Sequence, residues 1–247
     1  MSRLKDRIAV VSGAASGLGK AMALRLASEG ARIEILDRLD SSGTCKEIRA
    51  AGGDAESTVC DVTDEAQIAS AMAGIEKRRG HIDILVNNAG ILSGRTPWHA
   101  LSKAEVERFI DVNYLGYFLV SKAAYPLIKK SKTPRIIMIA SRTYFLANPG
   151  QMAYVGSKGA VMGMVRVMAR ECGEDGINVN AAMPGMVATP GTEEHSQEEA
   201  FNRVMMNQSI KKRVTPEHFA GLVAFLASDD AEFITGVVLP VDGGRTI

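Results

Sequence analysis

Seven short runs rich in β-branched residues alternate with helix-length segments along this chain. The runs cover residues 8–11, 32–36, 56–60, 82–86, 135–140, 177–181 and 237–241, and helical periodicity follows at segments such as 17–28, 64–79 and 152–173. Strands that alternate with helices pair in parallel, because each right-handed crossover helix returns the chain to the same sheet edge. The strand cores are almost continuously apolar, which is typical of a sheet covered on both faces. The sequence therefore predicts an α/β fold: one doubly wound domain over residues 1–247 with about seven parallel strands.

Charge and cysteine usage exclude several classes of function. The formal net charge is +1, from 29 Lys and Arg against 28 Asp and Glu, so the basic surplus of a nucleic-acid binder is missing. No apolar run approaches the roughly 18 residues of a membrane span, and the first residues lead directly into a strand, without room for a signal peptide. Cys45, Cys60 and Cys172 lie far apart and show no metal-ligand spacing. We expect a soluble, cytoplasmic protein with a small-molecule substrate and no metal, nucleic-acid or membrane partner.

A glycine-rich turn directly after the first run indicates a phosphate-binding site. Glycines at this place let the backbone approach a pyrophosphate, and the N-terminus of the following helix offers free N–H groups to its charge. A glycine-rich turn without a ligand is the alternative, but an acidic residue, Asp37, also closes the second run, where it could bind the ribose hydroxyls. We therefore predict a Rossmann-type cofactor site whose turn contributes Ser12, Gly13, Ser16, Gly17, Leu18 and Gly19.

Tyr154 and Lys158 are the candidate acid/base pair. They lie four residues apart on a predicted helix, so both side chains share one face. A phenol with a pKa near 10 is a poor base at neutral pH, and a neighbouring ammonium group favours its ionised form. Ser141 follows the fifth run, at the sheet edge where such folds bind ligands, and its hydroxyl could hold the substrate oxygen. The alternative for the pair alone is a packed tyrosine with a solvated lysine.

Together these motifs resemble the short-chain dehydrogenase/reductase family. The likeness rests on Gly-x-x-x-Gly-x-Gly at 13–19, Asn-Asn-Ala-Gly at 87–90, Tyr-x-x-x-Lys at 154–158 and Pro-Gly at 184–185, and it extends from about residue 5 to residue 244. The resemblance implies that Asn113 supports a proton-relaying water and that Lys158 also holds the nicotinamide ribose. Two departures are Ser12, where the family usually has threonine, and Arg142, where a small residue is common. The other cofactor contacts that the resemblance implies are Arg38, Asp61, Val62, Asn88, Ala89, Gly90, Pro184, Gly185, Val187 and Thr189.

NAD is the predicted coenzyme. The Asp37 carboxylate would repel the 2′-phosphate of NADP by about 4 kcal/mol per charge pair at 4 Å and an effective dielectric constant near 20. Arg38 could instead clasp that phosphate, but a lone arginine can also lie flat over the adenine. NADP-using relatives often place a basic residue just before the middle glycine, where this chain has Ser16. We expect a preference for NAD(H).

Three aromatic residues are candidate substrate contacts. Tyr144 and Phe145 follow Ser141 closely, a pattern similar to that of the family's pyridoxal and 1-phenylethanol dehydrogenases, which act on alcohols attached to aromatic rings. Trp98 follows the fourth run, and each of the three could instead serve packing alone. The irregular stretch 184–213 is more typical of a substrate lid than of a linker.

The predicted reaction is hydride transfer between NAD(H) and a secondary or aromatic-ring-bearing alcohol or its carbonyl. Alternatives are a non-catalytic NAD-binding sensor or scaffold, an isomerase or dehydratase, and a reductase of 3-oxoacyl thioesters or sugars. Gly156, Gly159 and Gly163 on the predicted helix 152–173 imply a close neighbour, because interior glycines cost helix stability unless something packs against them. Family members commonly form tetramers through this helix and the helix at 113–130. We therefore expect a homotetramer.

Overall fold

The structure is a computed structural model that describes residues 2–92 and 94–246. Its centre is a parallel sheet in the order β3-β2-β1-β4-β5-β6-β7. The strands are β1 (Ile8–Ser12), β2 (Arg32–Asp37), β3 (Asp54–Val59), β4 (Ile84–Asn87), β5 (Arg135–Ile139), β6 (Asn178–Pro184) and β7 (Val238–Val241). All seven match the predicted runs to within a few residues, which confirms the doubly wound α/β fold.

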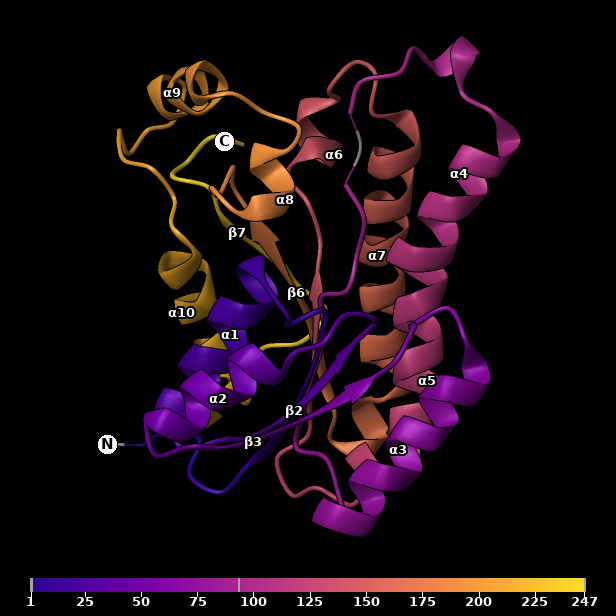
Figure 1. Cartoon of the computed structure of the whole chain (residues 1–247), viewed down its shortest axis with the longest axis vertical. Helices are drawn as coiled ribbons and strands as arrows, with labels where there is room; N and C mark the ends of the chain where they lie inside the picture. The colour runs from indigo at the N-terminus through magenta and orange to yellow at the C-terminus, as the bar shows by residue number, and fades with distance from the viewer. Residues whose placement is uncertain (1, 93, 247) are drawn as a thin grey trace.

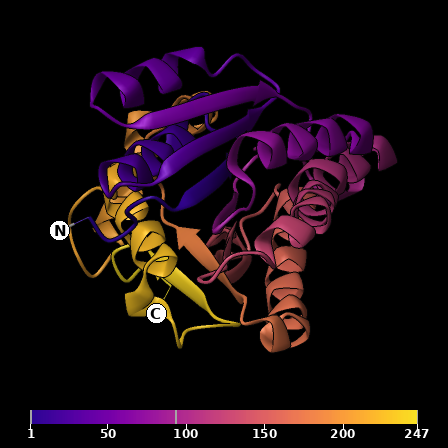
Figure 2. The ribbon, with the colours of Figure 1, turned by 90° about the horizontal axis from the view of Figure 1, so that it is seen from below.

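Helices cover both faces of the sheet (Figures 1 and 2). One face carries α1 (Gly17–Ser28), α2 (Ser42–Ala50) and α10 (Pro216–Ala227); the other carries α3 (Glu65–Arg79), α5 (Gly116–Ile128) and α7 (Met152–Glu171). Successive strand residues point to opposite faces, so Val10 packs into one core while Val11 packs into the other. Since strands buried on both faces must be apolar throughout, this explains the continuous apolar runs of the sequence.

The remaining helices are short or lie outside these layers. Helix α4 (Lys103–Ile110) contacts α7 and continues through a π-helical turn (Asp111–Leu115) into α5. The one-turn helix α6 (Thr143–Leu146) follows β5, and the segment after β6 holds α8 (Pro190–Glu193) and α9 (Glu198–Met206). Single 3₁₀ turns occupy Trp98–Ala100, Gly173–Asp175 and Asp229–Ala231.

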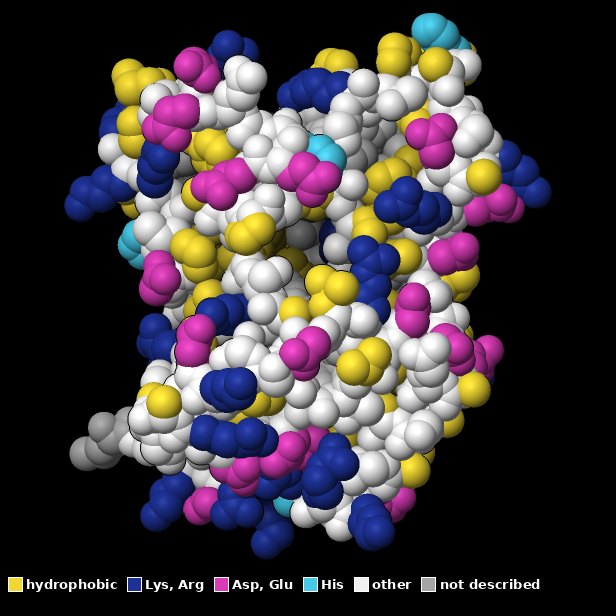
Figure 3. All heavy atoms as spheres, in the orientation of Figure 1, with side chains coloured by type: hydrophobic (Ala, Val, Ile, Leu, Met, Phe, Trp, Pro, Cys, Tyr) yellow, Lys and Arg dark blue, Asp and Glu magenta, His cyan; other side chains and the backbone are white. Residues whose placement is uncertain are grey.

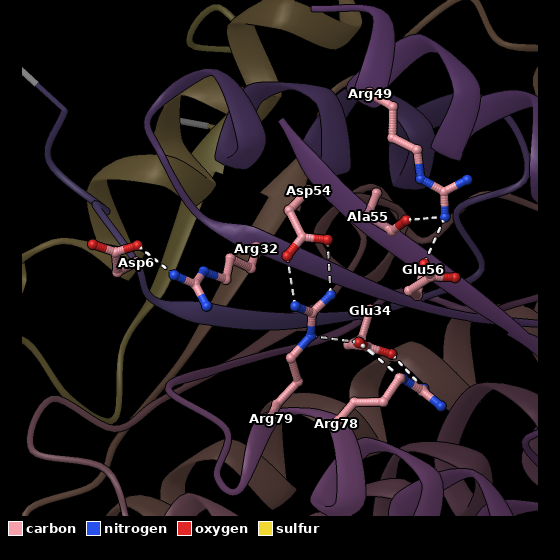
Figure 4. Close-up of polar contacts among 9 residues, drawn as sticks. All are labelled: Asp6, Arg32, Glu34, Arg49, Asp54, Ala55, Glu56, Arg78 and Arg79. Atoms are coloured by element: carbon pink, nitrogen blue, oxygen red, sulfur yellow. Dashed lines mark hydrogen bonds and ion pairs between the residues drawn. The ribbon is translucent and has the colours of Figure 1, made fainter. Parts of the chain in front are cut away.

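Glu34 is a carboxylate buried inside the sheet at β2, with 1% of its surface exposed. It receives hydrogen bonds from Arg78 and Arg79 at the end of α3, and Arg79 also pairs with Asp54 of the edge strand β3 (Figure 4). A buried charge is tolerated only when it is paired and hydrogen-bonded. This cluster therefore fastens the end of α3 to the outer strands, away from the carboxyl ends where ligands of such sheets bind.

Candidate active site

The turn between β1 and α1 is shaped by close backbone contacts. Gly13 has φ +68°, and a Cβ added there would lie 2.7 Å from Ala89 Cα. A Cβ added at Gly19 would lie 1.9 Å from the Gly13 carbonyl oxygen. Only glycine fits at these two positions, because the backbone of the turn packs tightly against the loop after β4 and against itself. Gly13 and Gly19 both line the cavity, as a phosphate-binding loop requires.

Ser12 and Asn88 hold this turn against the end of β4. Ser12 is fully buried, and its hydroxyl accepts hydrogen bonds from the backbone N–H groups of Asn88 (2.9 Å) and Ala89 (3.1 Å). The Asn88 amide donates back to the carbonyls of Ser12 (3.0 Å) and Gly13 (2.8 Å). Ser12 was predicted to touch the cofactor, but it lies beneath the turn and does not line the cavity. Asn87 is likewise buried, and its amide donates to Ser121.

Asp37 stands at the end of β2, beside the same turn. One carboxylate oxygen accepts a hydrogen bond from the Ala15 N–H at 2.8 Å, and the other accepts one from the Leu39 N–H at 3.0 Å. The side chain thus faces the glycine turn, with Arg38 next to it on the cavity wall. Asp61 lines the neighbouring part of the wall, where its carboxylate accepts hydrogen bonds from both the backbone and the hydroxyl of Thr63.

One cavity of about 590 Å³ joins these positions to the acid/base pair. Its volume lies in the range of small-molecule sites, and the space-filling view shows the surface hollowed near its centre (Figure 3). The predicted site residues that line it are Gly13, Ser16, Gly17, Leu18, Gly19, Asp37, Arg38, Asp61, Val62, Asn88, Ala89, Gly90, Ser141, Tyr154, Lys158, Pro184, Gly185, Val187 and Thr189. The structure therefore brings residues that are far apart in the sequence together around one cavity.

Tyr154 lies in the cavity wall with 7% of its surface exposed. Burial raises its pKa above the ordinary value of a phenol, while a hydrogen bond with the Ser141 side chain and the positive charge of Arg142 act in the opposite direction. Ser141 is itself held by Thr143, whose hydroxyl lies 2.9 Å from that of Ser141. The sequence-based expectation was that Lys158 lowers the Tyr154 pKa; in this structure the cation that lowers it is Arg142.

The Lys158 ammonium group is directed toward Tyr117 and not toward the Tyr154 hydroxyl. It donates to the Tyr117 hydroxyl at 3.0 Å and to the Ile139 carbonyl at 2.8 Å, and it lies 4.8 Å from the centre of the Tyr117 ring. Burial lowers the pKa of Lys158 to about 7. Tyr117 was not predicted as a site residue, although its place four residues after Asn113 puts both on one helix face.

Asn113 lies in the π-helical turn, completely buried and beneath the cavity wall. Its side chain accepts a hydrogen bond from the Ile91 N–H (2.8 Å) and donates to the Ile91 carbonyl (3.1 Å) and the Ser157 hydroxyl (3.1 Å). Asn113 thus ties the loop after β4 to α7 and to the helix that holds Tyr117. π-Helical turns occur frequently at functional sites.

The three aromatic residues predicted as substrate contacts lie outside the cavity. Trp98, Tyr144 and Phe145 are 72%, 49% and 55% exposed, and none of them is part of its lining. The Tyr144 ring packs on Gly159 of α7, where an added Cβ would lie 2.9 Å from the ring, and it meets Phe145 edge to face. The predicted close neighbour of Gly159 is therefore Tyr144 of the same chain, and stacking of either ring on a substrate has no support in this arrangement.

The segment after β6 contributes a further part of the wall. Thr189 caps α8 through its hydroxyl, and the bridge between Val187 and Val214 closes the base of the segment. His195 and Arg203 also line the cavity, as do Arg142 and the carboxyl-terminal Arg245. Of these four, the sequence pattern marked only Arg142, as a departure from the family.

Within the part of the chain that the structure describes, no helix is both long and apolar enough to cross a membrane. The same residues contain no group of three or more His, Cys, Asp or Glu side chains that could hold a metal ion.

Comparisons with known proteins agree with this geometry. A family model described as enoyl-(acyl carrier protein) reductase matches residues 13–246. The chain is 36% identical to 3-oxoacyl-[acyl-carrier-protein] reductase FabG of Thermotoga maritima over 252 residues, which cover 99% of this chain and all of the relative. Carveol dehydrogenase from Mycobacterium avium, solved in complex with NAD, superposes with a TM-score of 0.94 at 27% identity over 99% of both chains.

A second solved structure carries the other coenzyme. A protein described as an NAD(P)-dependent gluconate 5-dehydrogenase from Beutenbergia cavernae, with bound NADP at low occupancy, superposes with a TM-score of 0.91 at 35% identity over 98% of this chain and 97% of that one. The match of the family model and of the relatives spans nearly the whole chain. This protein is therefore an oxidoreductase of the short-chain dehydrogenase/reductase family, whose members use a nicotinamide cofactor.

Proposed function

We propose that this enzyme interconverts an alcohol and its carbonyl with NAD(H), with Tyr154 as the acid/base at the substrate oxygen. The observation that carries the proposal is the placement of Tyr154 and Ser141 in the same cavity wall as the glycine turn. A hydroxyl pair of this kind can hold a carbonyl oxygen and give it a proton as negative charge develops there. The proposed catalytic residues are Ser141, Tyr154 and Lys158, and Asn113 supports them from beneath the cavity wall through its hydrogen bonds to Ile91 and Ser157.

The cavity fits a dinucleotide. The glycine turn, which lines the cavity at the start of α1, suits a pyrophosphate, and the Asp37 carboxylate beside it suits a ribose. When bound, the nicotinamide supplies or accepts the hydride. Lys158 would hold its ribose, and Val187 and Thr189 would hold its carboxamide. The turn, the loop after β4 and the loop after β6 would thus bind successive parts of one molecule.

Tyr154 is suited to give a proton in the reduction direction. Because burial raises its pKa, the phenol holds its proton at neutral pH. The Ser141 hydroxyl, fixed by Thr143, orients the substrate oxygen toward it. In the oxidation direction the same phenol must first lose its proton, and the charge of Arg142 assists that step.

Replacement of Tyr154 by phenylalanine tests this role. Tyr154→Phe removes only the hydroxyl, so we expect kcat to fall by at least about 10² while NADH affinity is unchanged. Tyr144→Phe, on the outer surface, is the matched control and should keep full activity. If Tyr154→Phe retains more than a tenth of the wild-type kcat, Tyr154 is not the proton donor. A protein that binds NADH but turns over no substrate in a broad panel would instead be a sensor or scaffold.

NAD(H) is the proposed coenzyme because the Asp37 carboxylate borders the cavity beside the glycine turn. If solvent screening halves the repulsion between this carboxylate and the 2′-phosphate of NADP, the remaining energy still corresponds to a preference for NAD(H) of about one to two powers of ten. We expect kcat/KM to be at least about tenfold higher with NAD(H), and Asp37→Ser to remove that preference while Arg38 remains. A variant that keeps the full preference would show that Asp37 does not select the coenzyme.

The substrate oxygen belongs to a secondary alcohol or ketone in this proposal. The FabG relative, a 3-oxoacyl-[acyl-carrier-protein] reductase, favours 3-oxoacyl thioesters as the second candidate. A panel of ring-bearing ketones, aliphatic ketones, sugars and a 3-oxoacyl thioester, read at the NADH absorbance, distinguishes them by kcat/KM. A thioester that exceeds every simple ketone by more than tenfold would favour the second candidate.

Two further features complete the proposed enzyme. Residues 184–213 serve as the lid of one domain formed by residues 1–247, since α8 and α9 contribute to the cavity wall. The chain assembles as a homotetramer through α5 and α7. On that surface Phe118 and Val167 are about half exposed, and a Cβ added at Gly156 or Gly163 would meet open space within the described chain. Light scattering of wild type and Val167→Glu tests the assembly, which the new charge should disrupt.

A further inference from the structure

Arg142 is a buried cation that finds no partner among the residues that the structure describes. Only 7% of its surface is exposed, it lines the cavity next to Ser141, and its guanidinium makes no hydrogen bond or ion pair with any of the residues 2–92 and 94–246. Its Nη1 atom is fully enclosed. Arg79, another well-buried arginine, is instead held by the carboxylates of Glu34 and Asp54. Because burying an unpaired charge is costly, we expect an anion to bind to Arg142 when the enzyme works.

A second arginine stands beside it. Arg245 lines the same cavity, and its Nε atom is also enclosed without a partner among the described residues. Burial first, and then the neighbouring charge of Arg245, lowers the pKa of Arg142. Two guanidinium groups placed together destabilise each other unless an anion lies between them. Their common environment therefore favours an anionic ligand.

The nearest acid does not fill this role. Asp242 is buried, but its carboxylate is occupied by the backbone N–H groups of Gly244 and Arg245 and by the Thr246 hydroxyl. No ion pair within 4.0 Å joins it to either guanidinium in the described part of the chain. The negative charge of Asp242 raises the pKa of Arg142, but its carboxylate accepts no hydrogen bond from the guanidinium group of either arginine in the described part of the chain.

The two arginines follow other strands than the groups that suit the phosphates and the adenosine ribose of a dinucleotide. The glycine turn that suits the pyrophosphate follows β1, and Asp37 follows β2, whereas Arg142 follows β5 and Arg245 follows β7. In the sheet order, β5 and β7 lie on the other side of β4 from β1 and β2, so the arginines stand on the opposite half of the sheet edge from the adenosine end. The arginine pair belongs to the part of the cavity that is left for the substrate.

We infer that the substrate of this enzyme carries a carboxylate group, which Arg142 and Arg245 bind while its carbonyl faces Ser141 and Tyr154. The inference rests on the proposed function and adds the class of substrate: an oxo acid and the matching hydroxy acid. Guanidinium groups bind carboxylates through paired, charge-assisted hydrogen bonds. Because the charge of Arg142 already acts on the Tyr154 hydroxyl, the carboxylate lies only a short distance from the reacting carbonyl.

Matched pairs of ketones test the inference. With NADH, we would measure kcat/KM for 3-oxobutanoate, 4-oxopentanoate and 4-acetylbenzoate, each against its primary amide, which has the same shape without the charge. At least one carboxylate should exceed its amide by tenfold or more. Arg142→Gln should reduce that ratio to below about three, whereas Arg170→Gln, which removes an exposed arginine from α7, should leave it unchanged. Arg142→Lys keeps the charge without the paired geometry and should retain part of the preference.

Each other outcome has a definite meaning. Equal rates for carboxylates and amides would overturn the inference and leave the proposed function standing. A 3-oxoacyl-coenzyme A that exceeds the same acyl group on N-acetylcysteamine by tenfold, and loses this advantage in Arg142→Gln, would show that the arginines bind a thioester phosphate instead. If no ketone is reduced, the proposed function fails. In that case, calorimetric titration of the NADH complex with benzoate and with benzamide tests the carboxylate site independently of catalysis. Tenfold tighter benzoate binding that Arg142→Gln abolishes supports a carboxylate site, and equal binding overturns it.

Discussion

Lys158 should make the stability of the protein depend on pH in a range where most proteins are insensitive to it. Burial lowers the pKa of its ammonium group to about 7, from the ordinary value of 10.5. Between these values the unfolded chain holds the proton and the folded protein has released it. Stability therefore rises with pH through this window, and the full cost of burying the charge is present only below pH 7.

The magnitude follows from the two pKa values. Each pH unit in which only the unfolded state binds the proton adds about 1.4 kcal/mol to the free energy of unfolding. Because the folded amine is still half protonated at pH 7, the interval from pH 7.0 to 8.5 should add about 1.6 kcal/mol. In Lys158→Met this contribution disappears, while the contributions of all other groups are common to both proteins and cancel in the difference.

Urea unfolding of the cofactor-free protein, followed by far-ultraviolet circular dichroism at constant ionic strength and protein concentration, measures this quantity. We would compare the change in unfolding free energy between the two pH values for wild type and Lys158→Met, after checking that the denaturant slopes agree. A double difference below about 0.5 kcal/mol would refute the reasoning, since Lys158 would then keep its proton in the folded state.

Two further predictions concern the packing around the site, and a third concerns the buried Glu34 in the sheet. Tyr117→Phe removes one of the two hydrogen-bond acceptors of the Lys158 ammonium group. Such a bond to a charged donor is worth about 1.5 kcal/mol, so its loss should lower the Lys158 pKa by about one unit. In the same unfolding experiment, stability should then begin to rise at a pH about one unit lower. Gly19→Ala places a Cβ against the turn backbone and should weaken NADH binding more than tenfold in a fluorescence titration, whereas Gly43→Ala, with open space around it, should leave binding unchanged. Glu34→Gln leaves two arginines without their buried carboxylate and should cost about 3 kcal/mol in urea unfolding without a change in KM for NADH.

The cofactor end of the site could be predicted from sequence because backbone geometry determines it. In a parallel sheet the carboxyl ends of the strands share one edge, so the residues after β1, β2 and β4 must converge. Glycine at positions 13 and 19 is required by backbone contacts, and such positions are visible in the sequence pattern. Ser12 was misplaced because the same pattern does not show whether a side chain points out of the turn or beneath it.

The aromatic residues near Ser141 could not be placed from sequence. Because Tyr144 and Phe145 follow Ser141 closely in the chain, they must lie near it, but the sequence does not show in which direction their side chains point. The single turn α6 ends at Ala147, whose left-handed backbone (φ 47°) reverses the chain, and the rings of Tyr144 and Phe145 lie on the outer side of that turn. The Tyr144 ring packs against Gly159 of α7. Helical periodicity within α7 does not reveal such a contact with another segment of the chain.

Electrostatics at Tyr154 depends on contacts of the same long-range kind. The four-residue spacing placed Lys158 on the correct helix face, but Tyr117 and Ile139, from other elements, draw its ammonium group toward themselves. Burial then leaves that group only about half charged at neutral pH, whereas a guanidinium such as that of Arg142 stays protonated in proteins. The positive field at the phenol thus comes from the substrate side of the cavity. A carboxylate bound to Arg142 would neutralise this field and favour the protonated phenol, which is the form that carbonyl reduction consumes.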